Sequence, residues 1–243
     1  MSARKRADLL LVERKFFPSR AQAQAAIAAG RVTADGARVA KASDRLPAEA
    51  AIVAEAEHPW VSRGGIKLAA ALEHFGFDPR GVVALDIGAS TGGFTQVLLA
   101  RGAAHVYAVD VGRDQLHATL RNDPRVTSLE QVDIRDLDAA NLSSPPSVVT
   151  IDVSFISLKH VLPAASVLAA PSARLVALIK PQFEAGRGAL KKGIVRDAAV
   201  QMAVRDDIMH IVEALGWAVI GVIPSPIAGG DGNVEFLLGA RRD

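Results

Sequence analysis

Cysteine is absent from this chain of 243 residues, and its absence excludes two classes of protein. Without thiols there is neither a disulfide framework nor a thiolate metal site, and the reducing cytoplasm is the natural compartment. The six histidines lie far apart, and no two have the spacing of an HExxH zinc site. We therefore expect a cytoplasmic protein that holds no metal ion.

Long apolar runs are also missing. No stretch approaches the roughly 18 uninterrupted apolar residues that a membrane span needs. The basic N-terminus MSARKRADLLLVERK is interrupted by Glu13, Arg14 and Lys15 before a signal-peptide core could form. We expect no membrane partner, and a membrane-lytic activity is disfavoured. Aromatic residues make up only 5% of the chain, so alanine, valine and leucine must supply most of the core.

Positive charge is concentrated near the N-terminus, although the net charge of the whole chain is only +2. Up to Arg45 there are ten basic residues against four acidic ones, and the remainder is close to neutral. Such a concentration favours a polyanionic partner. The alternative, a solvated helix face, is about equally consistent with charge alone.

The basic region has the pattern of a small α+β domain. RADLLLVERKFF has apolar residues at helical spacing, and Ser19 is a plausible N-cap for a second helix, SRAQAQAAIAAG, that Gly30 ends. RVTADGARV then predicts a hairpin with a turn at Asp35-Gly36.

In this order the stretch SRAQAQAAIAAGRVTADGARVAKASDRL resembles the S-four-type RNA-binding domain. The resemblance implies RNA binding, and a small accessory cap is the alternative. The basic residues that we predict to contact RNA, including one in the following linker, are Arg4, Arg6, Arg20, Arg31, Lys41 and Arg63.

From Gly81 onward, apolar strands alternate with helical segments. This alternation predicts an α/β, doubly wound, Rossmann-like sheet of seven strands. The last two strands are separated only by SPIAGGDG, which predicts a terminal antiparallel hairpin. We expect an RNA-binding domain at 1–57, a linker at 58–64 and the large domain at 65–243. The hinge is indicated by HPWVSRGG, residues 58–65, which contains a proline and paired glycines.

A glycine-rich turn, ALDIGASTGGFTQVLL, opens the large domain, where glycines let the backbone approach a ligand closely. Carboxylates follow three successive strands, which favours a nucleoside cofactor at the carboxyl ends of the sheet. Asp86 and Asp133 also fit ordinary loop or capping carboxylates. No Walker lysine follows the turn, so triphosphate hydrolysis is disfavoured. The predicted cofactor-binding residues are Asp86, Gly88, Ala89, Ser90, Thr91, Gly92, Gly93, Phe94, Asp110 and Asp133.

Four charged residues have predicted positions at this same end of the sheet. Lys180 directly precedes Pro181, which holds it extended at the end of the strand RLVALIK. Asp152 ends the strand SVVTIDV, Glu235 sits within the last strand, and Lys67 lies on the helix before the first strand. Isolated charges are unfavourable in a core, so these residues should be paired or face a cleft.

In order and context, Lys67, Asp152, Lys180 and Glu235 resemble the K-D-K-E tetrad of the FtsJ-like ribose 2'-O-methyltransferases. Within that group the chain is similar to the TlyA-type rRNA methyltransferases, which are also labelled haemolysins. The segments that carry the resemblance are VSRGGIKL, LDIGASTGGFT, AVDVG, RNDPRV, DVSFISL, LIKPQFE and GNVEFLL.

The resemblance implies S-adenosyl-L-methionine as cofactor, ribosomal RNA or a ribosomal subunit as partner, and 2'-O-methylation of a cytidine ribose. The four tetrad residues would be catalytic. Because the chain ends soon after the last strand, the resemblance favours the large subunit. Since a free lysine keeps its proton up to about pH 10.4, Lys180 is either a true general base or a group that only orients the hydroxyl. The alternative function is a non-catalytic RNA-binding or ribosome-assembly factor, and the oligomeric state stays open.

Overall fold

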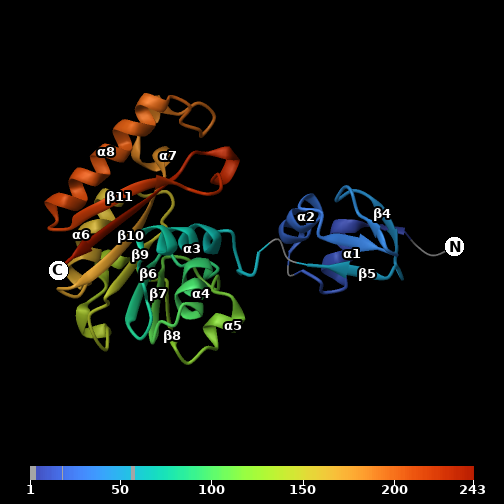
Figure 1. The fold of residues 1–243 in the computed structure, drawn as a ribbon, viewed down its shortest axis with the longest axis horizontal. Helices are drawn as coiled ribbons and strands as arrows, with labels where there is room; N and C mark the ends of the chain where they lie inside the picture. Colours follow the sequence, from blue (N-terminus) through green and yellow to red (C-terminus); the bar gives the residue numbers. More distant parts are fainter. Residues whose placement is uncertain (1–3, 18, 56–57) are drawn as a thin grey trace. The chain divides into compact units, whose positions relative to one another are not determined.

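The protein folds as two compact units, residues 1–59 and 60–243, in a computed structural model that describes residues 4–17, 19–55 and 58–243 (Figure 1). The domain boundary that the sequence places at residue 57 lies outside the described residues.

The N-terminal unit combines two helices with short strands. Its elements are β1 (Arg4–Arg6), α1 (Ala7–Glu13), α2 (Arg20–Ala28), β2 (Val32–Ala34), β3 (Ala37–Arg38), β4 (Arg45–Pro47) and β5 (Ile52–Ala54). The Ser19 hydroxyl caps α2 by accepting a hydrogen bond from the Gln22 amide. β2 and β3 form the predicted hairpin, and Asp35 and Gly36 at its turn both have positive φ, 51° and 79°.

Three strands of this unit were not predicted. β1 pairs with β4, and β5 pairs with β2, both antiparallel. Each of these strands has only three residues, which is too short for an alternating pattern to be visible. Leu11, Phe17, Ile27 and Val32 are buried between the helices and the strands, and they form a small core of the unit's own.

The C-terminal unit is built on a seven-stranded sheet in the order β11-β12-β10-β9-β6-β7-β8. The strands are β6 (Val83–Ile87), β7 (His105–Asp110), β8 (Val126–Glu130), β9 (Val148–Ile151), β10 (Ala173–Ile179), β11 (Ala218–Pro224) and β12 (Phe236–Arg242). The first five are parallel, whereas β12 runs antiparallel to both of its neighbours. The predicted doubly wound fold with a terminal antiparallel hairpin is confirmed.

Helices cover both faces of this sheet. The four long ones are α3 (Gly64–Phe75), α4 (Gly93–Ala100), α6 (Leu158–Leu168) and α8 (Ala198–Ala214). Leu68 of α3 and Leu98 of α4 pack in one core cluster, and Leu162 of α6 and Ile208 of α8 pack in another. Figure 1 shows α3 and α4 on one side of the sheet and α6 and α8 on the other. The short helical segments are α5 (Ala118–Arg121), α7 (Pro181–Glu184), η1 (Ile134–Asp136), η2 (Ala139–Asn141), η3 (Arg187–Ala189) and η4 (Gly230–Gly232).

The register of the sheet collects the charged residues at one edge. Because β6, β7, β9 and β10 are parallel, they end together at what we call the carboxyl edge. Asp152 directly follows β9 and Lys180 directly follows β10. Ile179 pairs with Phe236, so the antiparallel β12 begins at this edge. Glu235 therefore stands just before β12, not within it as the sequence predicted.

Among the described residues, no helix is both long and apolar enough to cross a membrane.

Candidate active site

Two cavities open at the carboxyl edge and share a wall. The first, which we call the Lys180 cavity, has a volume of about 280 Å³ and is lined by Lys67, Asp152 and Lys180. The second, the Asp110 cavity, has a volume of about 430 Å³. Gly88, Ser90, Asp152 and Ser154 line both cavities. A ligand lying in one cavity would thus come within reach of the other.

Lys180 and Asp152 form an ion pair at this shared wall. Lys180 Nζ lies 2.6 Å from Asp152 Oδ1 and donates a hydrogen bond to Ser154 Oγ at 2.9 Å. The Nζ–Oδ1 contact lacks hydrogen-bond geometry, and Oδ1 is buried without a hydrogen-bond partner among the described residues. An ammonium group carries three donors. Both side chains therefore keep hydrogen-bonding capacity for a ligand.

The backbone explains how Lys180 reaches this place. Its φ of −115° and ψ of 97° are extended, and Pro181 begins α7 at the next residue. Proline disfavours a helical conformation in its predecessor and is well suited to the first position of a helix. The chain therefore stops β10 sharply, and the side chain of Lys180, which is 9% exposed, enters the cavity wall.

Lys67 and Glu235 form the second lysine–carboxylate pair, with Nζ 2.5 Å from Oε2. Lys67 extends from α3 into the wall of the Lys180 cavity, and Glu235 does not line the cavity. The loop before Glu235 packs tightly on it, since a Cβ at Gly229 would lie 2.2 Å from Glu235 Oε1. The structure therefore brings together all four residues of the predicted tetrad. Two positive and two negative charges offset one another, as buried charges must.

The glycine-rich turn forms much of the remaining wall. Gly88 has φ of 79°, and a Cβ there would lie 2.5 Å from the carbonyl oxygen of Asp152. No other residue would let β6 and β9 approach so closely at this point. Of the predicted cofactor residues, those lining the Lys180 cavity are Gly88, Ala89, Ser90, Thr91, Gly93 and Phe94. Gly92, with φ of 94°, is the N-cap residue of α4 and lines neither cavity.

Asp110 and Asp133 line the Asp110 cavity. The carboxylate of Asp110 accepts hydrogen bonds from the amides of Gly112 and Ser90, both at 2.7 Å. Asp133 is engaged differently, because its Oδ2 lies 2.6 Å from Arg135 Nη2. The hydrogen bonds from this guanidinium lower the pKa of Asp133 to about 2. Asp133 also caps η1 by accepting from the Arg135 amide, as the capping interpretation allowed.

Asp86 lies beneath the cavities and lines neither of them. Its side chain is fully buried, and it accepts hydrogen bonds from the hydroxyls of Thr95 at 2.6 Å and Thr150 at 3.0 Å. Burial raises its pKa to about 7, the charge of Asp152 acts in the same direction, and the two hydroxyls oppose the shift. Asp86 fastens β6 to α4 and β9, and its direct contact with a ligand stays a prediction.

The predicted RNA-binding residues fall into two groups. Arg6 and Arg20 both form ion pairs with Asp8, which is fully buried, while their own side chains are about half exposed. The Arg6 guanidinium holds the pKa of Asp8 well below its usual range. Arg31 lies 3.8 Å from Glu55, and Arg4 and Lys41 are exposed. Arg63 belongs to the C-terminal unit and lines the Lys180 cavity.

Ser154 and Phe155 were missed by the sequence analysis. Phe155 lines the mouth of the Asp110 cavity, is 92% exposed and has φ of 64°. A bulky residue in this backbone region is uncommon. Its ring centroid lies 5.1 Å from that of Phe183. The signal was present in the segment DVSFISL, where an aromatic residue closely follows a strand-end carboxylate.

Comparisons with known proteins agree with this architecture. The FtsJ-like methyltransferase family matches residues 60–242, and the S4 domain matches residues 5–52. The chain belongs to the FtsJ-like methyltransferase family. The 16S/23S rRNA (cytidine-2'-O)-methyltransferase TlyA of Mycobacterium tuberculosis is 44% identical over 99% of this chain and 91% of its own length.

Two further relatives show how the likeness extends. The 23S rRNA (cytidine-2'-O)-methyltransferase TlyA of Campylobacter jejuni is 37% identical over 73% of this chain and 69% of its own length. A solved structure from Streptococcus thermophilus that carries the label hemolysin is 40% identical. It covers 100% of this chain and 90% of its own, with a TM-score of 0.78. The predicted membership of the TlyA-type group is confirmed.

Proposed function

We propose that this protein is an S-adenosylmethionine-dependent methyltransferase that modifies a ribose 2'-hydroxyl of ribosomal RNA. The observation that carries the proposal is the pair of adjoining cavities at the carboxyl edge. One is lined by Lys67, Asp152 and Lys180, with Glu235 paired to Lys67 outside the lining, and the other is lined by Asp110 among apolar side chains. A polar cluster beside a nucleoside-sized cleft is the arrangement that group transfer to a hydroxyl needs.

The residues of the Asp110 cavity fit the cofactor. Asp110 is placed to accept the ribose hydroxyls of an adenosine, as carboxylates at this strand end do in nucleoside-binding sheets. Val109, Val132 and Ile134 supply apolar surface for a base. Gly88 leaves room for the backbone to approach a ligand where the two cavities meet. When bound, S-adenosylmethionine supplies an electrophilic methyl group.

Lys180 and Asp152 act on the acceptor hydroxyl. The remaining donor of Lys180 and the carboxylate of Asp152, whose Oδ1 is ion-paired with Lys180, can together hold a ribose hydroxyl, with the carboxylate accepting its hydrogen bond. Asp152 and Ser154 keep the lysine in place, so the hydroxyl oxygen presents a lone pair to the incoming methyl carbon. The new oxygen–carbon bond would replace the carbon–sulfur bond of the sulfonium, which would leave as the neutral thioether, and the hydroxyl proton would pass to the Lys180–Asp152 pair or to water. Lys67, held by Glu235, adds a positive charge that favours the developing alkoxide.

The N-terminal unit supplies RNA affinity in this proposal. Arg6 and Arg20, whose guanidinium groups Asp8 holds in place at the surface, present fixed donors for phosphate. We assign this role to residues 1–57, the linker to 58–64 and catalysis to 65–243. The relatives' names support a cytidine as target. We propose the large subunit as substrate, in line with the name of the Campylobacter jejuni relative.

The experiment measures transfer of tritiated methyl groups from the cofactor to purified large and small ribosomal subunits and to deproteinised rRNA. Because a 2'-O-methylated ribose blocks alkaline cleavage of the adjacent phosphodiester, alkali-resistant dinucleotides identify the modified position. We expect label in large-subunit RNA and a resistant dinucleotide that contains cytidine.

The matched control is Lys159→Met, which removes an exposed lysine of α6 whose partner is Asp207. It should transfer like wild type, whereas Lys180→Met should not. If wild-type protein binds rRNA but transfers no label to any of these substrates, the chain is a non-catalytic RNA-binding factor and the proposal is wrong.

A further inference from the structure

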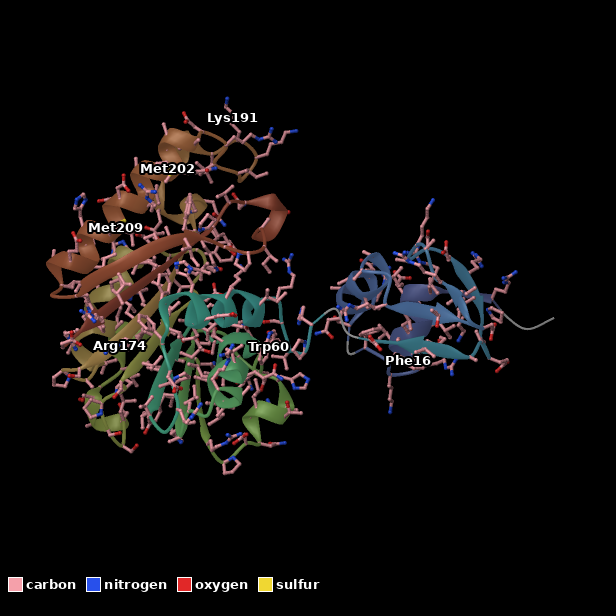
Figure 2. All side chains as sticks on the ribbon, viewed as in Figure 1. Phe16, Trp60, Arg174, Lys191, Met202 and Met209 are labelled. Carbon is pink, nitrogen blue, oxygen red and sulfur yellow. The ribbon has the colours of Figure 1, made fainter. Side chains whose placement is uncertain are left out.

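A basic hairpin lies on the loop between α7 and α8, in the segment of chain that follows Lys180. Residues 185–196 contain no acidic residue and four basic ones, namely Arg187, Lys191, Lys192 and Arg196. Lys191, Lys192 and Arg196 are exposed, and within the described ranges no ion pair involves any of them. Figure 2 shows Lys191 pointing away from the ribbon at the outer end of this loop. We call residues 191–194 the basic hairpin.

The basic hairpin has a defined backbone. Lys191 and Ile194 exchange both backbone hydrogen bonds, at 3.0 and 3.2 Å. Lys192 and Gly193 form the turn with φ of 54° and 79°. Positive φ at both central residues is typical of the type I′ turn, which prefers Asn or Asp followed by Gly. Next to it, Val195 is buried, and its carbonyl accepts a hydrogen bond from Gln201 of α8 at 2.7 Å.

The chain contains another turn of this kind with the preferred residues. Asp35-Gly36 has φ of 51° and 79°, nearly the values of Lys192-Gly193. In that turn the side chain of Asp35 accepts a hydrogen bond from the Ala51 amide. A lysine in the same position cannot accept such a hydrogen bond from a backbone amide, because it has only donors. Its charge, projected from the tip of the turn, is therefore available to a partner.

The basic hairpin is fastened to the segment that carries Glu235. The buried side chain of Asn233 donates hydrogen bonds to the carbonyls of Gly193, at 3.4 Å, and Gly230, at 3.0 Å. Asn233 lies two residues before Glu235, whose partner Lys67 lines the Lys180 cavity. The hairpin thus contacts the segment that leads to Glu235 at the carboxyl edge.

Nearby carboxylates do not neutralise it. Glu184 is engaged with the Ser157 hydroxyl and the Leu158 amide, and Asp197 caps α8 through the Ala199 amide. Asp231 lies in the neighbouring loop, and among the described residues no ion pair joins it to the hairpin. Uncompensated exposed cations of this kind attract a polyanion.

We infer that the basic hairpin, with Arg196 beside it, binds the phosphodiester backbone of RNA next to the target nucleotide. This inference rests on the proposed function for the identity of the RNA. It adds a phosphate-binding surface on the catalytic unit itself, separate from the arginines of the N-terminal unit. Lysines contact phosphates as point charges without reading sequence, so the hairpin contributes affinity and positioning rather than base specificity.

The test measures equilibrium binding of the full chain to deproteinised 23S rRNA over a series of KCl concentrations. The test variant is Lys191→Gln/Lys192→Asn, in which asparagine keeps the turn that type I′ geometry prefers. The control variant, Arg80→Gln/Arg101→Gln, removes two exposed cations at the opposite edge of the same sheet. We expect the test variant to bind about tenfold more weakly at low salt, with the slope of log affinity against log salt reduced by about 2. The control should match wild type.

Steady-state methyl transfer gives a second readout. The test variant should raise KM for RNA and leave kcat and cofactor affinity unchanged. Binding of the test variant equal to that of wild type, or an equal loss in the control, would overturn the inference. If wild type binds rRNA but transfers no methyl group while the test variant still loses affinity and slope, the proposed function fails and the hairpin's role stands.

Discussion

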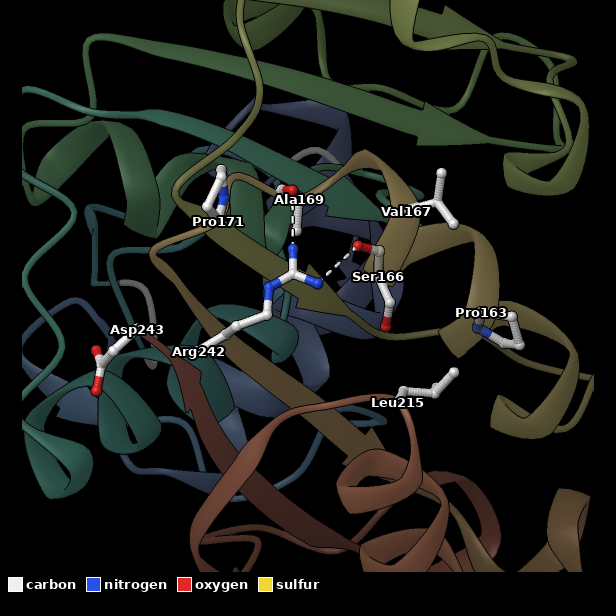
Figure 3. Close-up of a pocket in the computed structure, with 8 residues that line it drawn as sticks. All are labelled: Pro163, Ser166, Val167, Ala169, Pro171, Leu215, Arg242 and Asp243. Atoms are coloured by element: carbon white, nitrogen blue, oxygen red, sulfur yellow. Dashed lines mark hydrogen bonds between the residues drawn. The ribbon is translucent and has the colours of Figure 1, made fainter.

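A buried or partly buried cation lies at each of the two edges of the large sheet, and the two cations differ in their hydrogen-bond partners. At the carboxyl edge, Lys180 contacts Asp152 and Ser154 and keeps donor capacity toward a cavity. At the amino edge, where the parallel strands begin, Arg242 donates to the backbone carbonyls of Ser166, Ala169 and Ala170 at 2.9 to 3.1 Å. Figure 3 shows this guanidinium between the ends of β12 and α6.

The guanidinium of Arg242 also lies over the ring of Trp217, with Cζ 4.7 Å from the ring centroid, although its Nε has no hydrogen-bond partner in the part of the chain that the structure describes. Its partners are permanent parts of the fold, so the contribution of this cation is to stability. The partners of Lys180 leave acceptor and donor capacity for a ligand, which is the arrangement expected of a reactive site. Burial of a charged side chain therefore does not by itself indicate a functional site. The side chain must also keep hydrogen-bonding capacity that the fold does not use.

The largest effect should come from Lys180→Met. Removing the ammonium group takes away the donor that holds the acceptor hydroxyl, and groups of this kind contribute about 10²- to 10⁴-fold to rate. We expect single-turnover methyl transfer to fall at least about 1000-fold in the folded variant, assayed well below its melting temperature, with cofactor affinity retained. Lys180→Arg should recover little, because the planar guanidinium does not reproduce the geometry of the ammonium. Transfer by Lys180→Met at a tenth of the wild-type rate or better would place the essential group elsewhere.

The pH dependence of stability tests whether the buried Asp86 carboxylate destabilises the folded protein when it is ionised. Because its pKa is raised to about 7 in the folded state, the folded protein binds one more proton than the unfolded chain between about pH 4 and pH 7. The free energy of unfolding must therefore fall as pH rises through this window. Relative to Asp86→Asn, the wild type should lose up to about 4 kcal/mol from pH 4 to pH 8. Urea denaturation at several pH values measures the difference between the two proteins. If the free energies of unfolding of the two proteins changed with pH in the same way, Asp86 would already be ionised in the folded state throughout this pH range.

Variants of Glu235 separate the contribution of the Lys67–Glu235 pair to stability from its contribution to methyl transfer. Glu235→Gln leaves Lys67 buried without a counter-charge, and breaking a buried ion pair in this way costs about 3 kcal/mol. The double variant Lys67→Met/Glu235→Gln should recover most of this stability but not the lost methyl transfer. Thermal unfolding of the single and double variants measures the effect on stability, and their methyl-transfer rates measure the effect on catalysis. Recovery of activity together with stability would mean that Lys67 has only a structural role.

Arg242→Met should affect stability alone, and it has the smallest effect of the four. Three backbone carbonyls lose their charged donor, and we expect a loss of about 2 kcal/mol in the free energy of unfolding. The kcat of the folded variant should equal that of wild type at a temperature well below its melting point. A lowered kcat with unchanged cofactor binding would break the distinction between the two edges.

Much of the large unit was predictable because its patterns are long and regular. β6, β7 and β10 are mostly apolar runs of five to seven residues. Gly88 follows β6, Asp110 ends β7 and Lys180 follows β10. Pro181 fixed the conformation expected of Lys180. Pairing of two lysines with two carboxylates followed from the cost of isolated buried charges, although the sequence did not tell which lysine pairs with which carboxylate.

Other features depend on contacts that no local pattern encodes. β1, β4 and β5 exist through pairing across the N-terminal unit, and three residues cannot show their period. Asp86 lies within β6 and Asp110 ends β7, but only the fold places the hydroxyls of Thr95 and Thr150 around Asp86 and buries it beneath the cavities. The basic hairpin was hidden because a type I′ turn with lysine in place of asparagine is not recognisable from residue types.

The most direct measurement is a crystal structure of the full chain with S-adenosylmethionine bound. The account predicts the adenosine in the Asp110 cavity, its ribose hydroxyls on Asp110, and the methyl-bearing sulfur at the wall shared with the Lys180 cavity. A cofactor bound away from the carboxyl edge, or one whose sulfur points away from Lys180, would contradict it.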